Sequence, residues 1–199
     1  MPRKAYTINE IFHSLQGEGA RTGTPAVFVR FSGCNLRCRF CDTDHQGSST
    51  LMTAAQIVRE VVKYHAPMVV LTGGEPALQI DEQLVAALHR AGFTIAIETN
   101  GTLPLPPGID WVTLSPKDLF DGGDLMPCIL THCDELKVVY TGQDLSHYDA
   151  IEARHRFLQP CYVDDIDQRR RNLEATIDAV MANPGWRLSL QTHRLLGIR

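Results

Sequence analysis

Residues 25–41 read Pro-Ala-Val-Phe-Val-Arg-Phe-Ser-Gly-Cys-Asn-Leu-Arg-Cys-Arg-Phe-Cys, an apolar run that leads directly into three cysteines. The first part, Pro25–Gly33, is rich in Val and Phe and is typical of a buried strand. In the second part, Cys34, Cys38 and Cys41 have the spacing C-x3-C-x2-C. A buried strand followed by clustered thiols predicts a metal or redox site at one end of a sheet.

Downstream of the cysteines, strand patterns alternate with helical patterns. A helix is expected from a cap at Thr53 to about His65, and a second from about Asp81 to Ala91. A third follows from the apolar spacing of Leu173–Met181 and stops at Asn183-Pro184-Gly185. The expected strands are Met68–Thr72, Phe93–Glu98, Trp111–Leu114, Leu136–Tyr140, Leu158–Val163 and a short one at Leu188–Gln191.

This alternation predicts an α/β fold with a parallel sheet and helices on its outside. A full eight-unit barrel takes about 250 residues, and the 199 residues here have room for roughly six βα units. We therefore expect a partial, open TIM-type barrel that forms a single domain over residues 1–199. Residues 33–46 are expected to form its metal-binding loop.

Four polar segments each follow a predicted strand: the cysteine loop, Gly73-Gly74-Glu75-Pro76, Glu98-Thr99-Asn100-Gly101 and Ser115-Pro116-Lys117. In parallel sheets the chemistry gathers at the carboxyl ends of the strands. The four segments are therefore expected to meet at one site.

Composition narrows the classes of protein. The chain is 44% hydrophobic and 21% charged, and its net charge of −4 comes from 19 basic and 23 acidic residues. These values are typical of a folded globular protein and do not favour a general nucleic-acid binder. No apolar run approaches the roughly 20 residues of a membrane span, and the N-terminus does not resemble a secretion signal. We expect a cytoplasmic protein whose six cysteines stay reduced.

Three thiolates on one short loop can hold three irons of a [4Fe–4S] cluster and leave the fourth iron open to a ligand. Three alternatives remain from the loop alone. His45 can join Cys34, Cys38 and Cys41 in a closed Cys3His zinc site, or two of the cysteines can form a redox pair. The three cysteines can also be buried thiols without a metal, although clustered free thiols invite oxidation.

The cysteine spacing, followed by Gly73-Gly74-Glu75-Pro76 after the next predicted strand, resembles the radical S-adenosylmethionine (SAM) superfamily. The resemblance implies that the open iron binds the amino and carboxylate groups of SAM. It also implies that Phe40 lies near the adenine and that the backbone of Gly73, Gly74 and Glu75 binds the amino group. Glycines allow such a close approach of the backbone to a ligand.

Three further segments are more specific: FHSLQGEG at Phe12–Gly19, Cys41-Asp42-Thr43, and LSLQTHRLLGI at Leu188–Ile198. With them, essentially the whole chain resembles the 7-carboxy-7-deazaguanine synthase family. The resemblance implies conversion of 6-carboxy-5,6,7,8-tetrahydropterin to 7-carboxy-7-deazaguanine with loss of ammonia, in the biosynthesis of 7-deazapurines such as queuosine. A 5′-deoxyadenosyl radical removes hydrogen from C6, the ring contracts and SAM is regenerated, with Mg²⁺ assisting.

The same resemblance implies which residues bind Mg²⁺, SAM and the substrate. Thr43 offers a hydroxyl to Mg²⁺, which prefers oxygen ligands. SAM contacts fall on Phe40, Gly73, Gly74, Glu75, Ser115, Pro116, Lys117, Gln159, Pro160, Cys161 and Tyr162. Substrate contacts fall on Leu15, Gln16, Gly17, Arg30, Thr72 and, at the C-terminus, Arg199. A flavodoxin- or ferredoxin-type electron donor and a homodimer are also implied.

Some residues also have an interpretation of their own. Arg30 in an apolar strand offers a planar fork to a carboxylate, although a surface salt bridge is the alternative. Cys128, Cys133 and Cys161 are scattered and are expected to be buried thiols without a second cluster. Three apolar residues among the last five predict that the tail docks over the open side of the barrel.

Two other functions compete with this interpretation. An activase of a glycyl-radical enzyme shares the cysteine spacing and size, but SLQGEG and LSLQTH do not favour it. A zinc-stabilised binding module without chemistry is the second alternative.

Overall fold

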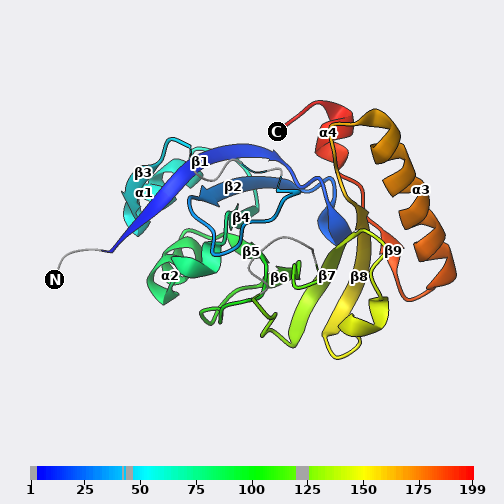
Figure 1. Cartoon of the computed structure of the whole chain (residues 1–199). Helices are drawn as coiled ribbons and strands as arrows, with labels where there is room; N and C mark the ends of the chain where they lie inside the picture. Colours follow the sequence, from blue (N-terminus) through cyan, green and yellow to red (C-terminus); the bar gives the residue numbers. More distant parts are fainter. Residues whose placement is uncertain (1–3, 42, 44–46, 120–125) are drawn as a thin grey trace.

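All nine strands of the described chain lie in one sheet, in the order β3-β1-β2-β4-β5-β6-β7-β8-β9. The computed structural model describes residues 4–41, 43, 47–119 and 126–199. The sheet is curved, its three longer helices lie on the outer side, and the C-terminus returns to the end of β1 (Figure 1). This is the expected partial barrel.

Seven strands run parallel from β2 to β9. The expected strands are all present, and three of them differ from the expected bounds by more than two residues: β7 and β8 begin four and six residues earlier, and the last strand ends three residues earlier. The observed strands are β2 (Pro25–Phe31), β4 (Met68–Gly73), β5 (Thr94–Thr99), β6 (Trp111–Leu114), β7 (His132–Tyr140), β8 (Glu152–Pro160) and β9 (Arg187–Leu188).

Two antiparallel strands at the other edge were not predicted from the sequence. β1 (Ala5–Leu15) pairs with β2, and β3 (Thr50–Thr53) pairs with β1. The register of β1 shifts between Ile8 and Glu10. Such a bulge reverses which face each later residue occupies, so β1 lacks the continuous alternation that identifies a strand.

The three longer helices cover the outer face. The capping box at Thr53 and Gln56 confirms the predicted helix start, but α1 (Ala54–Val61) ends earlier than expected. α2 (Glu82–Arg90) and α3 (Ile166–Ala182) match their predicted segments, and α4 (Thr192–Leu196) was not predicted. In the described residues, no α-helix follows β5, β6 or β7. The fold therefore has six long parallel strands but fewer helices than six complete βα units.

The two faces of the sheet bury different side chains. The outer face packs valines, leucines and isoleucines of β2, β4 and β5 against α1 and α2, and those of β7 and β8 against α3. On the inner face, toward the amino ends of the parallel strands, lies a smaller apolar cluster of Phe12, Ala26, Phe28, Met68, Val70 and Ala96.

Polar residues replace these apolar ones farther along the same face. Arg30 follows Ala26 and Phe28 at the next inward position of β2. By the same alternation, Thr72 continues β4, Glu98 continues β5, and Thr113 follows Trp111 on β6. The barrel is therefore packed at the amino ends of its strands and polar at their carboxyl ends, which is where a site is expected.

No helix in the described part of the chain is long and apolar enough to cross a membrane. The boundaries 1–199 for one domain and 33–46 for the loop stay predictions, since residues 42 and 44–46 lie outside the described part.

Candidate functional site

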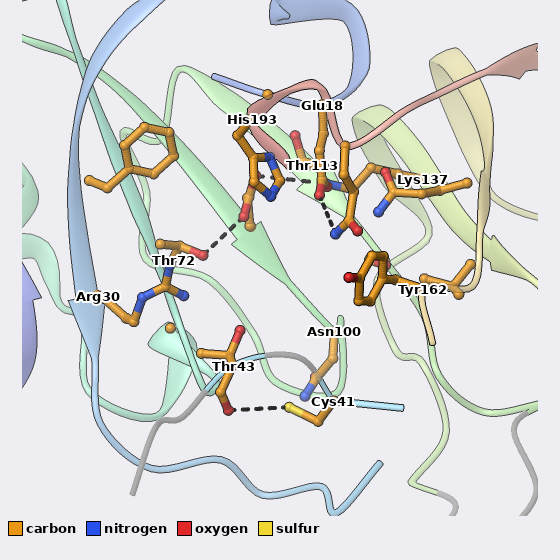
Figure 2. A pocket seen from close by; sticks show the side chains of 18 of the residues that line it. Glu18, Arg30, Cys41, Thr43, Thr72, Asn100, Thr113, Lys137, Tyr162 and His193 are labelled. Atoms are coloured by element: carbon orange, nitrogen blue, oxygen red, sulfur yellow. Dashed lines mark hydrogen bonds and ion pairs between the residues drawn. The ribbon is translucent and has the colours of Figure 1, made fainter. Parts of the chain in front are cut away.

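A pocket of about 330 Å³ opens at the carboxyl ends of the parallel strands. Figure 2 shows side chains from distant parts of the sequence converging on it. Of the predicted site residues, it is lined by Leu15, Gln16, Gly17, Arg30, Cys34, Cys38, Phe40, Cys41, Thr43, Thr72, Gly73, Gly74, Ser115, Lys117, Gln159, Pro160, Tyr162 and Arg199. Glu75, Pro116 and Cys161 are not among the residues that line it.

The three clustered thiols lie on one side of this pocket. Burial raises the pKa of the thiols of Cys34 and Cys38. Asn35 anchors the loop because its amide donates to Thr102 Oγ1 at 2.7 Å and its oxygen accepts from Asn100 Nδ2 at 3.0 Å. Thiols that share a pocket on an anchored loop suit the sulfur ligands of an iron–sulfur cluster.

The zinc alternative requires side chains that can together hold a single metal ion. Among the described residues, no group of three or more Cys, His, Asp and Glu side chains is arranged to hold one metal ion. His45, the fourth ligand of the zinc alternative, lies outside the described residues.

The start of the cysteine loop rests on the end of β4. The backbone N–H of Gly74 donates to Phe31 O at 3.1 Å, and that of Glu75 donates to Gly33 O at 2.9 Å. A Cβ on Gly74 would lie 2.0 Å from Gly33 O. The glycines therefore allow two backbone segments to touch, and they also line the pocket.

Glu75 joins the ends of two strands. Its side chain is fully buried and accepts from Ala77 N, Thr99 Oγ1 and Asn100 N at 2.7–2.9 Å. Burial raises the pKa of this carboxyl, although these hydrogen bonds act in the opposite direction. The carboxylate thus fixes the turns after β4 and β5, and Glu75 does not itself line the pocket.

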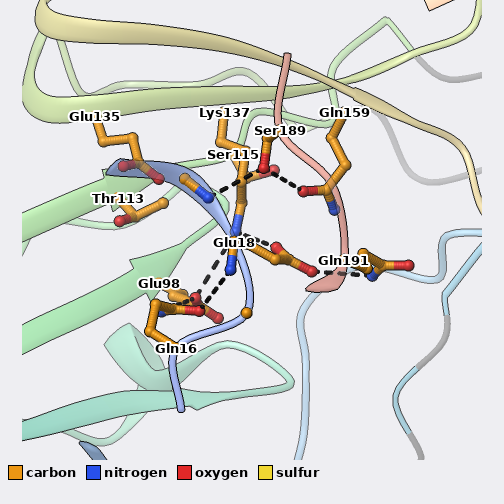
Figure 3. Close-up of polar contacts among 12 residues, drawn as sticks. Gln16, Glu18, Glu98, Thr113, Ser115, Glu135, Lys137, Gln159, Ser189 and Gln191 are labelled. Atoms are coloured by element: carbon orange, nitrogen blue, oxygen red, sulfur yellow. Dashed lines mark hydrogen bonds and ion pairs between the residues drawn. The ribbon is translucent and has the colours of Figure 1, made fainter. Parts of the chain in front are cut away.

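A buried charge network forms the floor of the pocket (Figure 3). Lys137 Nζ contacts Glu18 Oε2 and lies 3.7 Å from Glu98 Oε1. Glu98 also accepts from Gln16 Nε2 at 3.1 Å and from Thr72 Oγ1 at 2.9 Å. Two carboxylates and one ammonium, with hydrogen bonds to amide and hydroxyl groups, are thus held at the carboxyl ends of three strands.

The network decides which groups are ionised. Burial alone would lower the pKa of Lys137, but the carboxylates of Glu18 and Glu98 outweigh it and hold that pKa above its usual value. Burial alone would raise the pKa of Glu98, but Lys137, Gln16 and Thr72 hold it below its usual value. Both groups therefore remain charged at neutral pH.

The loop after β1 is tied across the barrel to β7 and β8. Ala20 N donates to Glu135 Oε2 at 2.7 Å, and Gly19 N donates to Ser189 Oγ at 3.0 Å. Ser189 Oγ in turn donates to Gln159 at 3.0 Å. These contacts hold the Gln16–Glu18 segment over the pocket, where the resemblance had implied substrate contacts.

Lys117 and Tyr162 also line the pocket. Lys117 Nζ donates to the backbone and hydroxyl oxygens of Ser115, and burial lowers the pKa of its ammonium. The ring of Tyr162 has Arg169 and Arg194 at 4.4 and 3.8 Å from its centroid. These side chains offer cationic and aromatic surface beside the thiols.

The C-terminal tail docks as predicted, but the predicted reason was wrong. Leu195, Leu196 and Ile198 are 74%, 62% and 39% exposed. Polar contacts hold the tail instead: Thr192 N and Oγ1 donate to Gly17 O at 2.9 and 2.8 Å, and Ser14 Oγ donates to Arg199 O. His193 also packs against Gly17, where a Cβ would lie 2.2 Å from its Nδ1 atom.

Several pocket residues were present in the quoted motifs or expected strands but received no role. Glu18, Glu98, Lys137 and His193 all line the pocket. Glu98 and Lys137 continue the inward alternation of β5 and β7, so the strand pattern carried the necessary signal. Glu18 lies on a loop and His193 on the five-residue α4, which was not predicted, so the sequence gave no face for either residue.

The comparisons with known proteins identify the family of the chain. The Radical SAM superfamily model matches residues 28–122, which include the cysteine loop and the turns after β4 and β5. The protein is thus a radical SAM enzyme, a class that uses a [4Fe–4S] cluster and SAM.

Full-length relatives define the family more narrowly. The chain is 57% identical to the 7-carboxy-7-deazaguanine synthase of Bacteroides thetaiotaomicron over 96% of its length and 98% of that relative. It is 43% identical to that of Burkholderia multivorans, over 97% and 99%. The crystal structure of QueE from Escherichia coli matches with a TM-score of 0.75 and 29% identity, covering 94% of both chains. The chain belongs to the 7-carboxy-7-deazaguanine synthase family, and neither the activase nor the zinc module is favoured.

Gly74→Ala is expected to separate the cysteine loop from β4. The added Cβ would meet backbone that cannot move without breaking the 2.9 Å bond from Glu75 to Gly33. We expect a loss of about 1–3 kcal/mol in the free energy of unfolding and lower iron content after reconstitution. Gly185→Ala is the control, since its Cβ would meet nothing within 4 Å. Equal iron content and equal stability in the two variants would contradict the role of Gly74.

Lys137→Met is expected to leave Glu18 and Glu98 without their cation. Breaking such a buried pair costs about 3 kcal/mol in the free energy of unfolding at pH 7. Lys63→Met is the control, because Lys63 pairs with Glu60 at the surface, and it should cost less than about 1 kcal/mol.

The Lys137→Met deficit should also depend on pH. The lowered pKa of Glu98 stabilises the wild-type fold above the unfolded pKa, and this contribution is lost as pH falls through the folded pKa. The difference between wild type and variant should therefore shrink from pH 7 toward pH 4. Denaturant unfolding at both pH values measures it, and a constant difference would contradict the charge network.

Proposed function

We propose that the chain converts 6-carboxy-5,6,7,8-tetrahydropterin to 7-carboxy-7-deazaguanine and ammonia, and so acts as a carbon–nitrogen lyase. Ammonia is the only by-product, so the conversion is balanced without a net oxidant or reductant. The product would feed the biosynthesis of 7-deazapurines, including queuosine.

One observation carries this proposal: the three thiols and the predicted substrate residues line the same pocket. A cluster on Cys34, Cys38 and Cys41 would face the polar groups that suit a pterin. When bound, the cluster and SAM supply a 5′-deoxyadenosyl radical that removes hydrogen from C6 of the pterin.

The chain's own residues would orient SAM. Phe40 would pack near the adenine, and the backbone of Gly73, Gly74 and Glu75 would accept hydrogen bonds from the amino group. Further contacts are proposed from Ser115, Lys117, Gln159, Pro160 and Tyr162, which all line the pocket. Pro116 and Cys161 adjoin them in the chain, and we propose that they support this wall.

The floor network would orient the pterin and hold its protons in place. The pterin edge alternates donors and acceptors, and Glu98, Gln16 and Thr72 present acceptors and donors to it. The backbone of Leu15 and Gly17 would cover one side of the ring. Lys137 would keep Glu98 ionised, so that Glu98 accepts hydrogen bonds and does not donate them.

Arg30, with Arg199 at the tail, would bind the substrate carboxylate. Arg30 is in a salt bridge with Glu10, as the surface alternative held, but it lies in the pocket wall and not on the outer surface. Thr43 would add an oxygen ligand to Mg²⁺, which would join the carboxylate to the protein. The tail would exclude water from radical intermediates.

An electron donor of the flavodoxin or ferredoxin type is proposed, as are a homodimer and a cytoplasmic location. The family supports a small-molecule substrate and an external electron source.

The direct test is anaerobic incubation of reconstituted protein with reductant, SAM and carboxytetrahydropterin. The expected result is a deazaguanine chromophore that requires all three additions. Cleavage of SAM without any deazaguanine would contradict the proposed substrate.

Replacing Cys34, Cys38 or Cys41 by Ala is expected to remove most of the bound iron and all turnover. The fold should survive, because the apolar clusters of the sheet do not include these side chains. Cys133→Ala is the control, since this half-buried thiol lies outside the pocket lining. Iron analysis and thermal unfolding measure both effects. Full iron and full turnover in any one of the three variants would overturn the assignment of the cluster ligands.

Thr43→Ala is expected to raise the Mg²⁺ concentration needed for half-maximal rate on the order of tenfold. Thr43→Ser keeps the hydroxyl and should retain the wild-type Mg²⁺ response. SAM affinity should be the same in both variants. If the Mg²⁺ response of Thr43→Ala were unaltered, Thr43 would not be a ligand.

A further inference from the structure

One carboxylate lies between two guanidinium groups in the pocket wall formed by β1 and β2. Glu10 is opposite Arg30 in the register of these strands. Glu10 Oε1 accepts from Arg30 Nε at 3.0 Å, and Glu10 Oε2 contacts Arg199 Nη2. Each oxygen of the carboxylate therefore holds a different arginine.

Both guanidinium groups lie over the same aromatic ring. The Cζ atoms of Arg30 and Arg199 are 5.8 and 4.9 Å from the centroid of Phe12. Phe12 is itself stacked on Phe28 at 5.0 Å. Two cations on one ring repel each other, and a shared carboxylate offsets this repulsion. The two guanidinium side chains and the one carboxylate side chain together carry a net positive charge.

A β-bulge places Glu10 on this wall. Tyr6 and Ile8 are buried in the outer core with α1, and regular alternation would put Glu10 on that same face. The register shift between Ile8 and Glu10 reverses the alternation. Glu10 and Phe12 consequently share the inner side of the sheet with Arg30. A bulge of this kind is often found where a side chain must be aimed at a site.

The tail reaches the same point through its backbone. Ser14 Oγ donates to Arg199 O, so the last residue is attached to β1 by its carbonyl as well as by its side chain. Arg199 is otherwise two-thirds exposed. The position of its guanidinium group therefore depends on Glu10 and Phe12.

We propose that Glu10 is a positioning residue, which fixes Arg30 and Arg199 side by side so that they bind the substrate carboxylate together. The inference rests on the proposed function, since the carboxylate is that of the pterin. In the part of the chain that the structure describes, Arg30 Nε is bonded to Glu10 and its two Nη atoms have no hydrogen-bond partner. Figure 2 shows the Arg30 guanidinium group extending into the pocket. Guanidinium groups bind carboxylates through such paired donors.

The opposite role makes an opposite prediction. If Glu10 only competed with the substrate for the two arginines, its neutralisation would raise the positive charge and tighten carboxylate binding. If Glu10 positions them, neutralisation releases both side chains and weakens binding. Glu10→Gln, which keeps the shape of the side chain, separates the two roles.

The experiment measures pterin binding and turnover by anaerobically reconstituted Glu10→Gln. For carboxytetrahydropterin, Kd and KM should rise roughly tenfold, with kcat changed less than about twofold. Tetrahydropterin without the carboxylate should bind as to wild type, and iron content should not change. Glu10→Asp should recover part of the affinity. Glu174→Gln is the control, because Glu174 pairs with Arg170 on α3 at 2.9 Å and lies outside the pocket lining.

A second variant tests the tail and does not depend on the folding of the first. Arg199→Gln at the exposed C-terminus should also weaken binding of carboxytetrahydropterin, and binding of the pterin without the carboxylate should not change. Glu10→Gln combined with Arg199→Gln should cost less than the sum of the two single losses, as expected for residues that act as a unit.

Tighter or unchanged binding of carboxytetrahydropterin by Glu10→Gln would overturn the positioning role. An equal loss for both pterins would overturn it too, because it would indicate a general effect on the pocket. If wild type converted the pterin and Glu10→Gln behaved identically, the inference would fail and the proposed function would stand. If wild type neither bound nor converted the pterin, both would fail.

Discussion

The site depends on two backbone hydrogen bonds between the cysteine loop and the end of β4. Gly74 N donates to Phe31 O and Glu75 N donates to Gly33 O, so the loop that carries the thiols starts against the turn after the neighbouring strand. Only glycine permits this approach at position 74, where a Cβ would overlap the carbonyl oxygen of Gly33. The parallel pairing of β2 with β4 brings the two segments to the same edge. This contact brings the three thiols and the glycines of the turn after β4 into one pocket.

The same sheet sets the chemistry of the pocket through simple alternation. On the inner face, Phe28 precedes Arg30, Val70 precedes Thr72 and Ala96 precedes Glu98. Apolar side chains thus close the barrel at one end, and charged and hydroxyl groups line it at the other. The buried ammonium of Lys137 is tolerated because Glu18 and Glu98 compensate it. The network binds strands β5 and β7 to the loop after β1, and the same charged side chains line the pocket.

The parallel part of the fold could be predicted from the sequence because its strands are short, apolar and bounded by turn residues. The convergence of four post-strand segments followed from parallel topology alone. β1 could not be predicted, because its bulge breaks the alternation between Ile8 and Glu10. The pairing of Glu10 with Arg199 joins residues at opposite ends of the chain, and no local pattern signals it. The tail docks through hydroxyl and carbonyl groups while its leucines stay exposed, and hydrophobicity therefore gave the wrong reason.

The central claim is that three thiolates leave one iron open and that SAM binds there, inside the pocket that also holds the substrate residues. Electron paramagnetic resonance of the reduced, reconstituted protein with isotope-labelled SAM tests it most directly. The account predicts the signal of a reduced [4Fe–4S] cluster, with hyperfine coupling to the labelled amino nitrogen and carboxylate oxygen of SAM. A colourless protein with one zinc ion, or a cluster signal without coupling to the labels, would contradict it.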